Sequence, residues 1–373
     1  MEDVIRKNWS PHPGEFIREE IEARGWSQRD LAFILGSSEQ ALNTIISGKR
    51  GISPEMAKAM GNAFDVPAEL FLNLQKSYEL AQARDPDPGI SKRAKIQSKY
   101  PIREMIKRGW LQDTDASMLE AQIARFFEVP SIDDVPHLAY AAKKTNYDEL
   151  SPEQLAWFFR VKQIAKNIEV PQYSEKLFRE GINQLKALLV DPEEIRHVPR
   201  LMMECGIRFI IVEALPGSKI DGACFWLGES PVIGMSLRLD RIDNFWFVAR
   251  HEGEHVLKRH GREHEIIDSE TMESQDSDAI AEEERIANAA AADFCVPQKH
   301  LNDFIARKNP FFYEKDIIGL ARLFNCHPGL VVGQIRKKTN RWDFLTKYLV
   351  KVRSILTRSS IVDGWGHQFP ISL

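Results

Sequence analysis

Short amphipathic segments fill the first 84 residues of the chain. Apolar side chains recur within each segment at helical spacing, several segments end at glycine, and proline or serine stands where each begins. The pattern predicts five short helices, whose starts are marked by Pro13, Ser27, Ser37 or Ser38, Ser53, and Pro67. Short capped helices around one apolar core are typical of a helix-turn-helix domain at residues 1–84, and a helical protein-interaction module is the alternative.

The pattern of polar and apolar positions changes after residue 84. Residues 85–99 combine proline, aspartate and glycine with basic residues, which predicts a linker. Residues 100–171 carry apolar and aromatic side chains at helical spacing. We therefore expect a helical connector whose aromatic residues form a core.

Three β-rich runs lie within the next segment, residues 172–345. They cover residues 207–212, 223–227 and 231–237, and glycine, proline and serine separate them. They predict a small sheet whose last strand could align an extended peptide by strand addition. The acidic residues 262–279 predict a loop, and residues 346–373 predict a helix with a poorly ordered tail. The expected fold is mainly α, with an α+β unit after the helical segments.

One amphipathic helix, predicted over residues 241–260, carries residue types that bind metal ions. His251 and His255 are four residues apart, so both imidazoles lie on one face of the helix. Glu252 follows the first histidine, where a carboxylate can act as the general base of a hydrolase. This H-E-x-x-H pattern is the arrangement found in zinc peptidases. A solvated helix that happens to carry two histidines is the alternative.

A second helix, predicted over residues 277–295, supplies a candidate third ligand. Glu284 falls within its apolar arc, where a carboxylate is costly unless it is paired or bound to a metal. Glu282 points to the opposite side and Glu283 lies on the margin, so both fit an acidic helix start stabilised by the macrodipole. Asn288, one turn beyond Glu284, can hydrogen-bond the outer nitrogen of a liganding histidine. We expect zinc held by the two histidines and Glu284.

Composition sets limits on partners and compartment. The net charge of −4 argues against general polyanion binding. Four scattered cysteines without C-x-x-C spacing favour reduced thiols, as in a cytoplasmic protein. Because no apolar run approaches about twenty residues and the amino terminus has no signal pattern, we expect a cytoplasmic protein with no membrane contact.

The two segments with metal-binding residues together resemble the ImmA/IrrE family of metallopeptidases. The H-E-x-x-H residues are followed by Glu284-Arg285-Ile286-Ala287-Asn288 and a close at Val296-Pro297. The resemblance covers roughly residues 201–350. It implies a zincin-like α+β fold with a small twisted sheet on the metal helices, one zinc ion and a protein substrate. Two departures stand out. Gly253-Glu254 inverts the usual order between the histidines, and Ile286 replaces a common acidic residue, which favours Glu284 as the ligand.

Residues 12–75 resemble HigA-type antitoxins of the XRE helix-turn-helix class over their whole length. The resemblance implies a major-groove surface of Ser38, Gln40, Asn43 and Thr44, with phosphate contacts from Lys49 and Arg50. Amide side chains suit adenine edges. Glu39 departs from the basic residue often found at its position. A homodimer on a palindromic operator would add the contacts of two half-sites.

These observations lead to two expected functions from different classes. The first is a transcriptional regulator that binds double-stranded DNA and carries a zinc metallopeptidase, which cleaves a repressor or a toxin. The second is an antitoxin-like repressor whose peptidase-like domain binds a toxin or senses a signal without proteolysis.

Overall fold

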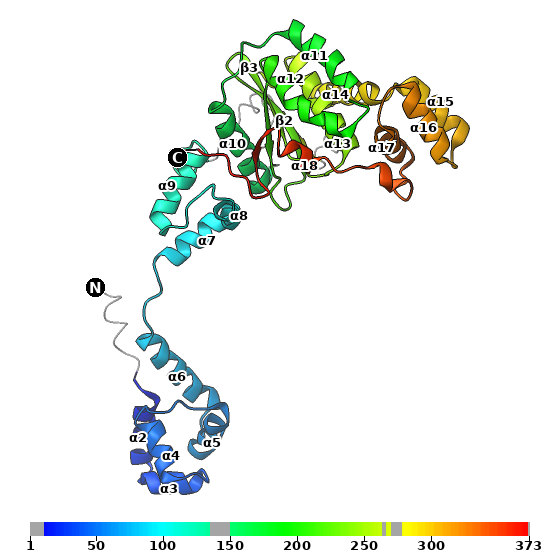
Figure 1. The fold of residues 1–373 in the computed structure, drawn as a ribbon. Helices are drawn as coiled ribbons and strands as arrows, with labels where there is room; N and C mark the ends of the chain where they lie inside the picture. Colours follow the sequence, from blue (N-terminus) through cyan, green and yellow to red (C-terminus); the bar gives the residue numbers. More distant parts are fainter. Residues whose placement is uncertain (1–10, 135–149, 263–265, 270–277, 372–373) are drawn as a thin grey trace. The chain divides into compact units, whose positions relative to one another are not determined.

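The structure is a computed structural model that describes residues 11–134, 150–262, 266–269 and 278–371. The chain divides into two compact units, residues 1–87 and residues 88–373 (Figure 1). Each unit has an apolar core of its own.

Unit 1 contains the five helices that the sequence predicts. They are α2 (Pro13–Ala23), α3 (Gln28–Ile34), α4 (Glu39–Ile46), α5 (Pro54–Phe64) and α6 (Ala68–Gln82). Serine side chains cap three of them: Ser27 accepts from Asp30 N, Ser38 from Ala41 N and Ser53 from Met56 N. The choice between Ser37 and Ser38 is thus settled for Ser38. Buried apolar residues from all five helices meet in one core, among them Ile17, Leu31, Leu42, Phe64 and Phe71.

Unit 2 surrounds a five-stranded mixed sheet with helices. The strands are β1 (Arg208–Val212), β2 (Ile220–Leu227), β3 (Ser230–Met235), β4 (Ile266–Ser269) and β5 (Ile361–Asp363). The longer helices are α7 (Gly89–Lys99), α8 (Ile102–Lys107), α9 (Ala116–Phe126), α10 (Pro152–Lys166), α11 (Glu175–Ala187), α12 (Val198–Glu204), α13 (Ile242–Leu257), α14 (Asp278–Cys295), α15 (Gln298–Lys308), α16 (Glu314–Leu323) and α17 (Pro328–Thr339). Short helical turns complete the unit: η3 (Pro192–His197), η5 (Thr346–Tyr348) and α18 (Arg353–Leu356).

The sheet has the strand order β4-β2-β3-β1-β5. Strand β1 is parallel to both β3 and β5, whereas β2 is antiparallel to β3 and to β4. Strand β3 therefore lies inside the sheet with neighbours on both sides. Its predicted role in aligning a peptide by strand addition is wrong, because strand addition needs an unpaired edge.

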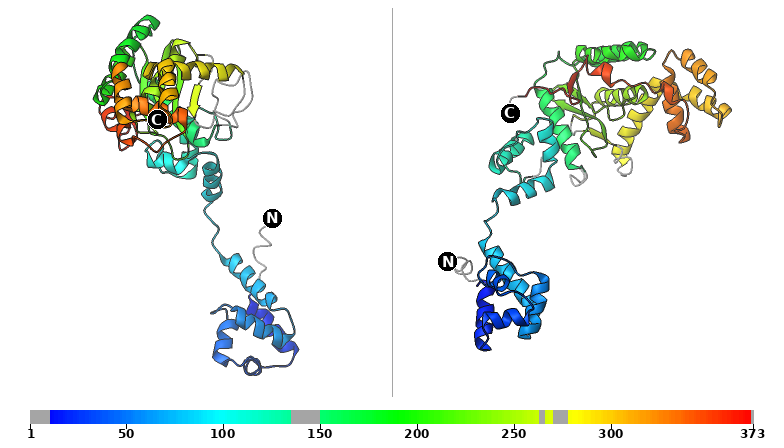
Figure 2. Two further views of the ribbon diagram at one scale, coloured as in Figure 1. Left: turned by 90° about the vertical axis from the view of Figure 1, so that its right-hand side faces the viewer. Right: turned by 60° about the horizontal axis from the view of Figure 1, so that its bottom comes forward.

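Alternate side chains of the sheet enter two different cores, as expected for strands whose residues point to opposite faces. Phe209 and Ile233 pack with α11, α12 and α13 on one face. Ile210 and Val232 pack with α10 and the aromatic residues of α9 on the other, and two further views show the helices on both faces (Figure 2). The segment expected as a connector thus shares a core with the sheet.

Three segments are more ordered than the sequence suggests. The expected linker 85–99 contains helix α7, the expected acidic loop contains strand β4, and the expected tail contains strand β5. Strands β4 and β5 are short and gain their backbone partners from β2 and β1, far away in the sequence. A local pattern gives no signal for such pairing. None of the helices in the described ranges has the length and apolar content needed to cross a membrane.

A buried ion pair ties β5 to α10. Arg160 and Asp363 are each 2 % exposed in their side chains, and Arg160 Nε donates to Asp363 Oδ2 at 2.8 Å. Trp110 Nε1 donates to Asp363 Oδ1 at 2.9 Å, and Arg160 Nη2 donates to the carbonyl of Phe369 at 2.8 Å. The carboxylate therefore has a partner for each oxygen, which offsets the cost of its burial.

We expect Asp363→Ala to lower the free energy of unfolding by about 3–5 kcal/mol, because it leaves the Arg160 guanidinium buried without its counter-charge. Urea unfolding followed by tryptophan fluorescence measures this change. Glu204→Ala is the control, since the Arg200–Glu204 pair is 75 % and 57 % exposed and should contribute less than about 1 kcal/mol. Equal losses in the two variants would contradict this account.

Candidate metal centre

Helix α13 carries the H-E-x-x-H residues in the interior of unit 2. It begins at Ile242, one residue after the predicted start, and Arg241 before it makes no side-chain cap. Asp243 in the first turn accepts hydrogen bonds from Arg241 at 3.0 and 2.9 Å. Because α13 packs between the sheet and its neighbouring helices, its residues are buried nearly all round.

Three predicted ligands converge at the contact between α13 and α14. His251 Nε2 lies 3.0 Å from His255 Nε2, and the carboxylate of Glu284 lies 3.2 Å from the first and 3.4 Å from the second. Four ligands in a tetrahedron around zinc, with bonds of about 2.0–2.1 Å, stand about 3.3 Å apart. The donor set and its spacing therefore fit a zinc ion. Among the described residues, these three form the one such group.

The electrostatics of Glu284 suit a metal ligand. Burial alone would raise the pKa of its carboxyl group, but hydrogen bonds and charge from His251 and His255 outweigh this and lower the pKa to about 2. The carboxylate is thus ionised at neutral pH, the form that binds a cation. The histidines are almost fully buried, whereas the Glu284 side chain is 30 % exposed.

The neighbouring acidic residues of α14 do not join this group. Glu282 pairs with Arg285 at 2.6 Å at the surface, as its predicted orientation requires. Glu283 approaches the ring of His260 at 3.9 Å. Asn288 is exposed, and within the described residues it makes no hydrogen bond to either histidine. The prediction that Asn288 supports a liganding histidine is therefore wrong.

The neighbour of His255 is instead His260, which the sequence argument missed. Its Nδ1 lies 3.1 Å from His255 Nδ1. The available signal was a third histidine five residues after His255, but the predicted helix ran to residue 260. The helix ends at Leu257, and the turn after it brings the His260 ring back to His255.

Glu252 points from α13 toward strand β2. Its side chain is fully buried, and a Cβ atom added to Gly222 would lie 2.2 Å from Glu252 Oε1. Burial raises the pKa of the nearby Cys224 thiol, and the charge of Glu252 adds to that effect. Gly222 therefore provides the space that the carboxylate occupies against β2.

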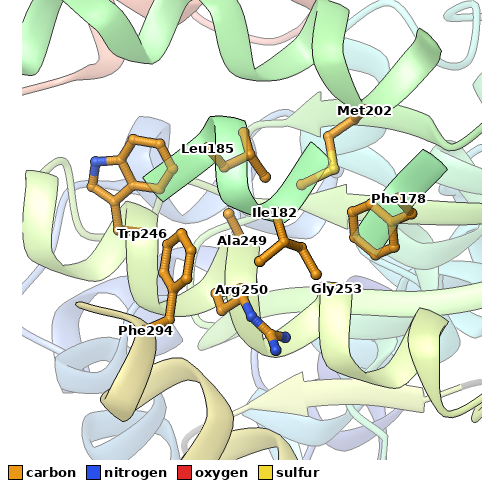
Figure 3. A pocket seen from close by; sticks show the side chains of 9 residues that line it. All are labelled: Phe178, Ile182, Leu185, Met202, Trp246, Ala249, Arg250, Gly253 and Phe294. Carbon is orange, nitrogen blue, oxygen red and sulfur yellow. The ribbon is translucent and has the colours of Figure 1, made fainter. Parts of the chain in front are cut away.

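The two residues between Glu252 and His255 face away from the metal group. A Cβ added to Gly253 would lie 3.1 Å from Phe178 Cζ, which shows that Gly253 permits close packing of α11 on α13. Figure 3 shows Gly253 at a small apolar crevice with Phe178, Ile182 and Phe294. Glu254 pairs with Arg250 at 2.6 Å. The inverted order of Gly253 and Glu254 thus serves packing behind the site.

In unit 1, α3 and α4 form the helix-turn-helix. Ser38, Gln40 and Asn43 are exposed, and the last two lie one turn apart on the same face of α4. Thr44 is half-buried, and its hydroxyl donates to the carbonyl of Ala41 at 2.7 Å. The hydroxyl of Thr44 is therefore already engaged within the helix. Lys49 and Arg50 follow α4 and are both exposed.

Comparisons with known proteins identify the class of unit 1. Residues 17–71 match the helix-turn-helix family. Virulence-associated protein I of Dichelobacter nodosus is 35% identical over 88 residues, which are 23% of this chain and 82% of the relative. The chain belongs to the helix-turn-helix family through this unit, an XRE-type domain of the DNA-binding, antitoxin-like class.

Further relatives match about a fifth of the chain. Virulence-associated protein A' of Dichelobacter nodosus is 40% identical over 73 residues, and the match spans 19% of this chain and 64% of that protein. The solved Pseudomonas aeruginosa antitoxin HigA with its higBA promoter is 40% identical, with 19% of this chain and 78% of that chain covered and a TM-score of 0.19. A HigA-family antidote protein from Coxiella burnetii is 31% identical over 20% of this chain and 80% of its own, with a TM-score of 0.19.

We expect Gly222→Ala to lower the free energy of unfolding by about 1–3 kcal/mol, because the new methyl group overlaps Glu252 Oε1 and crowds Val248. Both neighbours are buried and cannot move aside freely. Gly319→Ala on α16 is the control, since no atom lies within 4 Å of the added Cβ and helix propensity should stabilise it by up to about 1 kcal/mol. Urea unfolding of both variants measures the difference, and an unchanged midpoint for Gly222→Ala would refute the crowding.

Proposed function

We propose that this protein is a DNA-binding transcriptional regulator whose second unit is a zinc metallopeptidase that cleaves a protein partner, a repressor or a toxin. The observation that carries the peptidase is the convergence of His251, His255 and Glu284 within ligand distance, and Glu252 follows the first of them along α13. The resemblance of the two helices to the ImmA/IrrE family supports the same reading.

His251, His255 and Glu284 would hold the zinc ion. Two neutral nitrogens and one carboxylate are a common catalytic ligand set, and three protein ligands leave a tetrahedral ion one open position. When bound there, zinc would supply Lewis-acid chemistry at neutral pH by polarising a peptide carbonyl and favouring ionisation of water.

Glu252 would be the general base. Its carboxylate is one residue from a ligand and is held in a fully buried position by the space at Gly222. It would accept a proton from the attacking water and deliver it to the leaving amine. The low-dielectric surroundings strengthen its interaction with any developing charge.

Unit 1 would bring this activity to an operator. Gln40 and Asn43 are exposed amides on α4, and amides pair with adenine edges in the major groove. Lys49 and Arg50 would contact phosphates, and a homodimer would place two such helices on a palindrome. Relatives solved with promoter DNA support this role.

An antitoxin-like repressor without proteolysis is the second candidate. The likeness of unit 1 to antitoxins favours it. In that case unit 2 would bind a toxin or sense a signal, and the metal would be structural.

Glu284→Ala should lose stoichiometric zinc, because it removes the one carboxylate of the ligand set. Metal analysis of the purified protein after dialysis measures the content. Glu282→Ala is the matched control, since this carboxylate lies two residues away on the same helix and pairs with Arg285. Full zinc content in the Glu284 variant would rule out the proposed ligand set.

Glu252→Gln should keep zinc but abolish cleavage of an identified partner, because an amide cannot accept the proton of the attacking water. Zinc content and cleavage are measured on the same variant. Wild-type behaviour of Glu252→Gln in every biological output would favour the second candidate.

Replacement of Gln40 and Asn43 by alanine should abolish the footprint on the protein's own promoter region, because it removes the proposed base contacts without touching the core. Footprinting at fixed salt concentration measures the change. Asn62→Ala, which removes an exposed amide from α5, should leave the footprint intact. A double variant that protects the same sequence as the wild type would contradict the proposal that α4 contacts the bases.

A further inference from the structure

The two ring nitrogens of His255 face different partners. Nε2 lies 3.0 Å from His251 Nε2 and 3.4 Å from a Glu284 oxygen, so it belongs to the candidate metal group. Nδ1 lies on the other side of the ring, 3.1 Å from Nδ1 of His260. The side chain of His255 is fully buried, so its outer nitrogen depends on the protein for a hydrogen-bond partner.

The backbone of His260 is fixed to the sheet. Its N–H donates to the carbonyl of His255 at 2.9 Å, and its own carbonyl accepts from Trp226 Nε1 at 3.1 Å. Gly261, at φ 77°, follows it, and a Cβ there would lie 2.7 Å from the carbonyl oxygen of Cys224 on β2. The turn after α13 thus approaches β2 too closely for any residue except glycine, and this approach sets the position of the His260 ring.

Helix α14 supplies the next partner. His260 Nε2 lies 3.9 Å from Glu283 Oε1, and Glu283 precedes the ligand candidate Glu284. A chain of side chains therefore runs from Glu283 through His260 to His255. Glu283 lies on α14, and His255 contacts the next residue of the same turn, Glu284.

The hydrogen bond between His255 and His260 has one direction of donation that fits metal binding at His255. A histidine that binds a metal through Nε2 carries its proton on Nδ1 and donates it outward. Because two Nδ1 atoms face each other, His260 must then accept at Nδ1 and carry its own proton on Nε2. That nitrogen lies 3.9 Å from Glu283 Oε1, within reach of the carboxylate's charge but beyond direct hydrogen-bond distance. The two facing Nδ1 atoms are then one donor, on His255, and one acceptor, on His260.

We propose that His260 is a positioning residue for the metal centre: it accepts the hydrogen bond of His255 Nδ1 and is itself oriented by Glu283. The inference rests on the proposed zinc site and gives His260 the role that the sequence suggested for Asn288. Loss of such an outer partner typically weakens metal binding by 10–100-fold.

Two substitutions at one position separate this role from simple packing. Asn places its side-chain oxygen where His260 has Nδ1, so His260→Asn keeps an acceptor for His255. His260→Leu keeps the volume but has no acceptor. With the full-length protein and zinc in competition with a chromogenic chelator, we expect affinity about 10–100-fold weaker for His260→Leu and within about threefold of wild type for His260→Asn.

A double-mutant cycle tests the role of Glu283. Glu283→Ala should weaken zinc binding in the wild-type background but have no further effect in the His260→Leu background, because its influence passes through the ring. Thermal unfolding of the metal-free variants shows whether they remain folded, and the comparison is made between folded proteins.

The outcomes separate this inference from the proposed function. Wild-type protein that binds no zinc would overturn both. Zinc affinity equal in the wild type and in His260→Leu would overturn the role of His260 and leave the metal site standing. Equal losses in His260→Leu and His260→Asn would show that packing, not the acceptor, matters, and would also overturn it.

Discussion

The contact between α13 and α14 is the constraint on which the candidate site depends. One helix supplies two imidazoles four residues apart, and the other supplies a carboxylate that reaches both. The two rings hold the pKa of this carboxyl group low, so Glu284 stays in the ionised form that a cation requires. Other features of unit 2 support this contact. Helix α13 packs on the sheet, Gly253 lets α11 pack closely against α13, and Gly222 leaves space for the side chain of Glu252.

Local sequence patterns predicted much of this arrangement. Caps at Ser27 and Ser53, the three central strands and the inward position of Glu284 rather than Glu282 were predicted from local patterns, and the structure has each of them. The helical face decides which carboxylate turns inward, and that face can be read from neighbouring residues alone.

The remaining features depend on contacts between distant segments. Strand β5 is three residues long and forms only because β1 offers an edge, and β4 likewise depends on β2. The approach of His260 to His255 requires the helix to end at Leu257 and the turn to meet β2. Asn288 was a reasonable partner by spacing, but α14 turns it to solvent. These features depend on packing between distant segments, which a local sequence pattern does not predict.

The central claim concerns the atoms around one metal ion. X-ray absorption at the zinc edge of the purified, zinc-loaded protein tests it most directly, because it reports the identity and distance of the ligands. The account requires nitrogen and oxygen neighbours at about 2.0–2.2 Å, with the outer-shell scattering of two imidazoles. Sulfur neighbours at about 2.3 Å, or scattering from water alone, would contradict it.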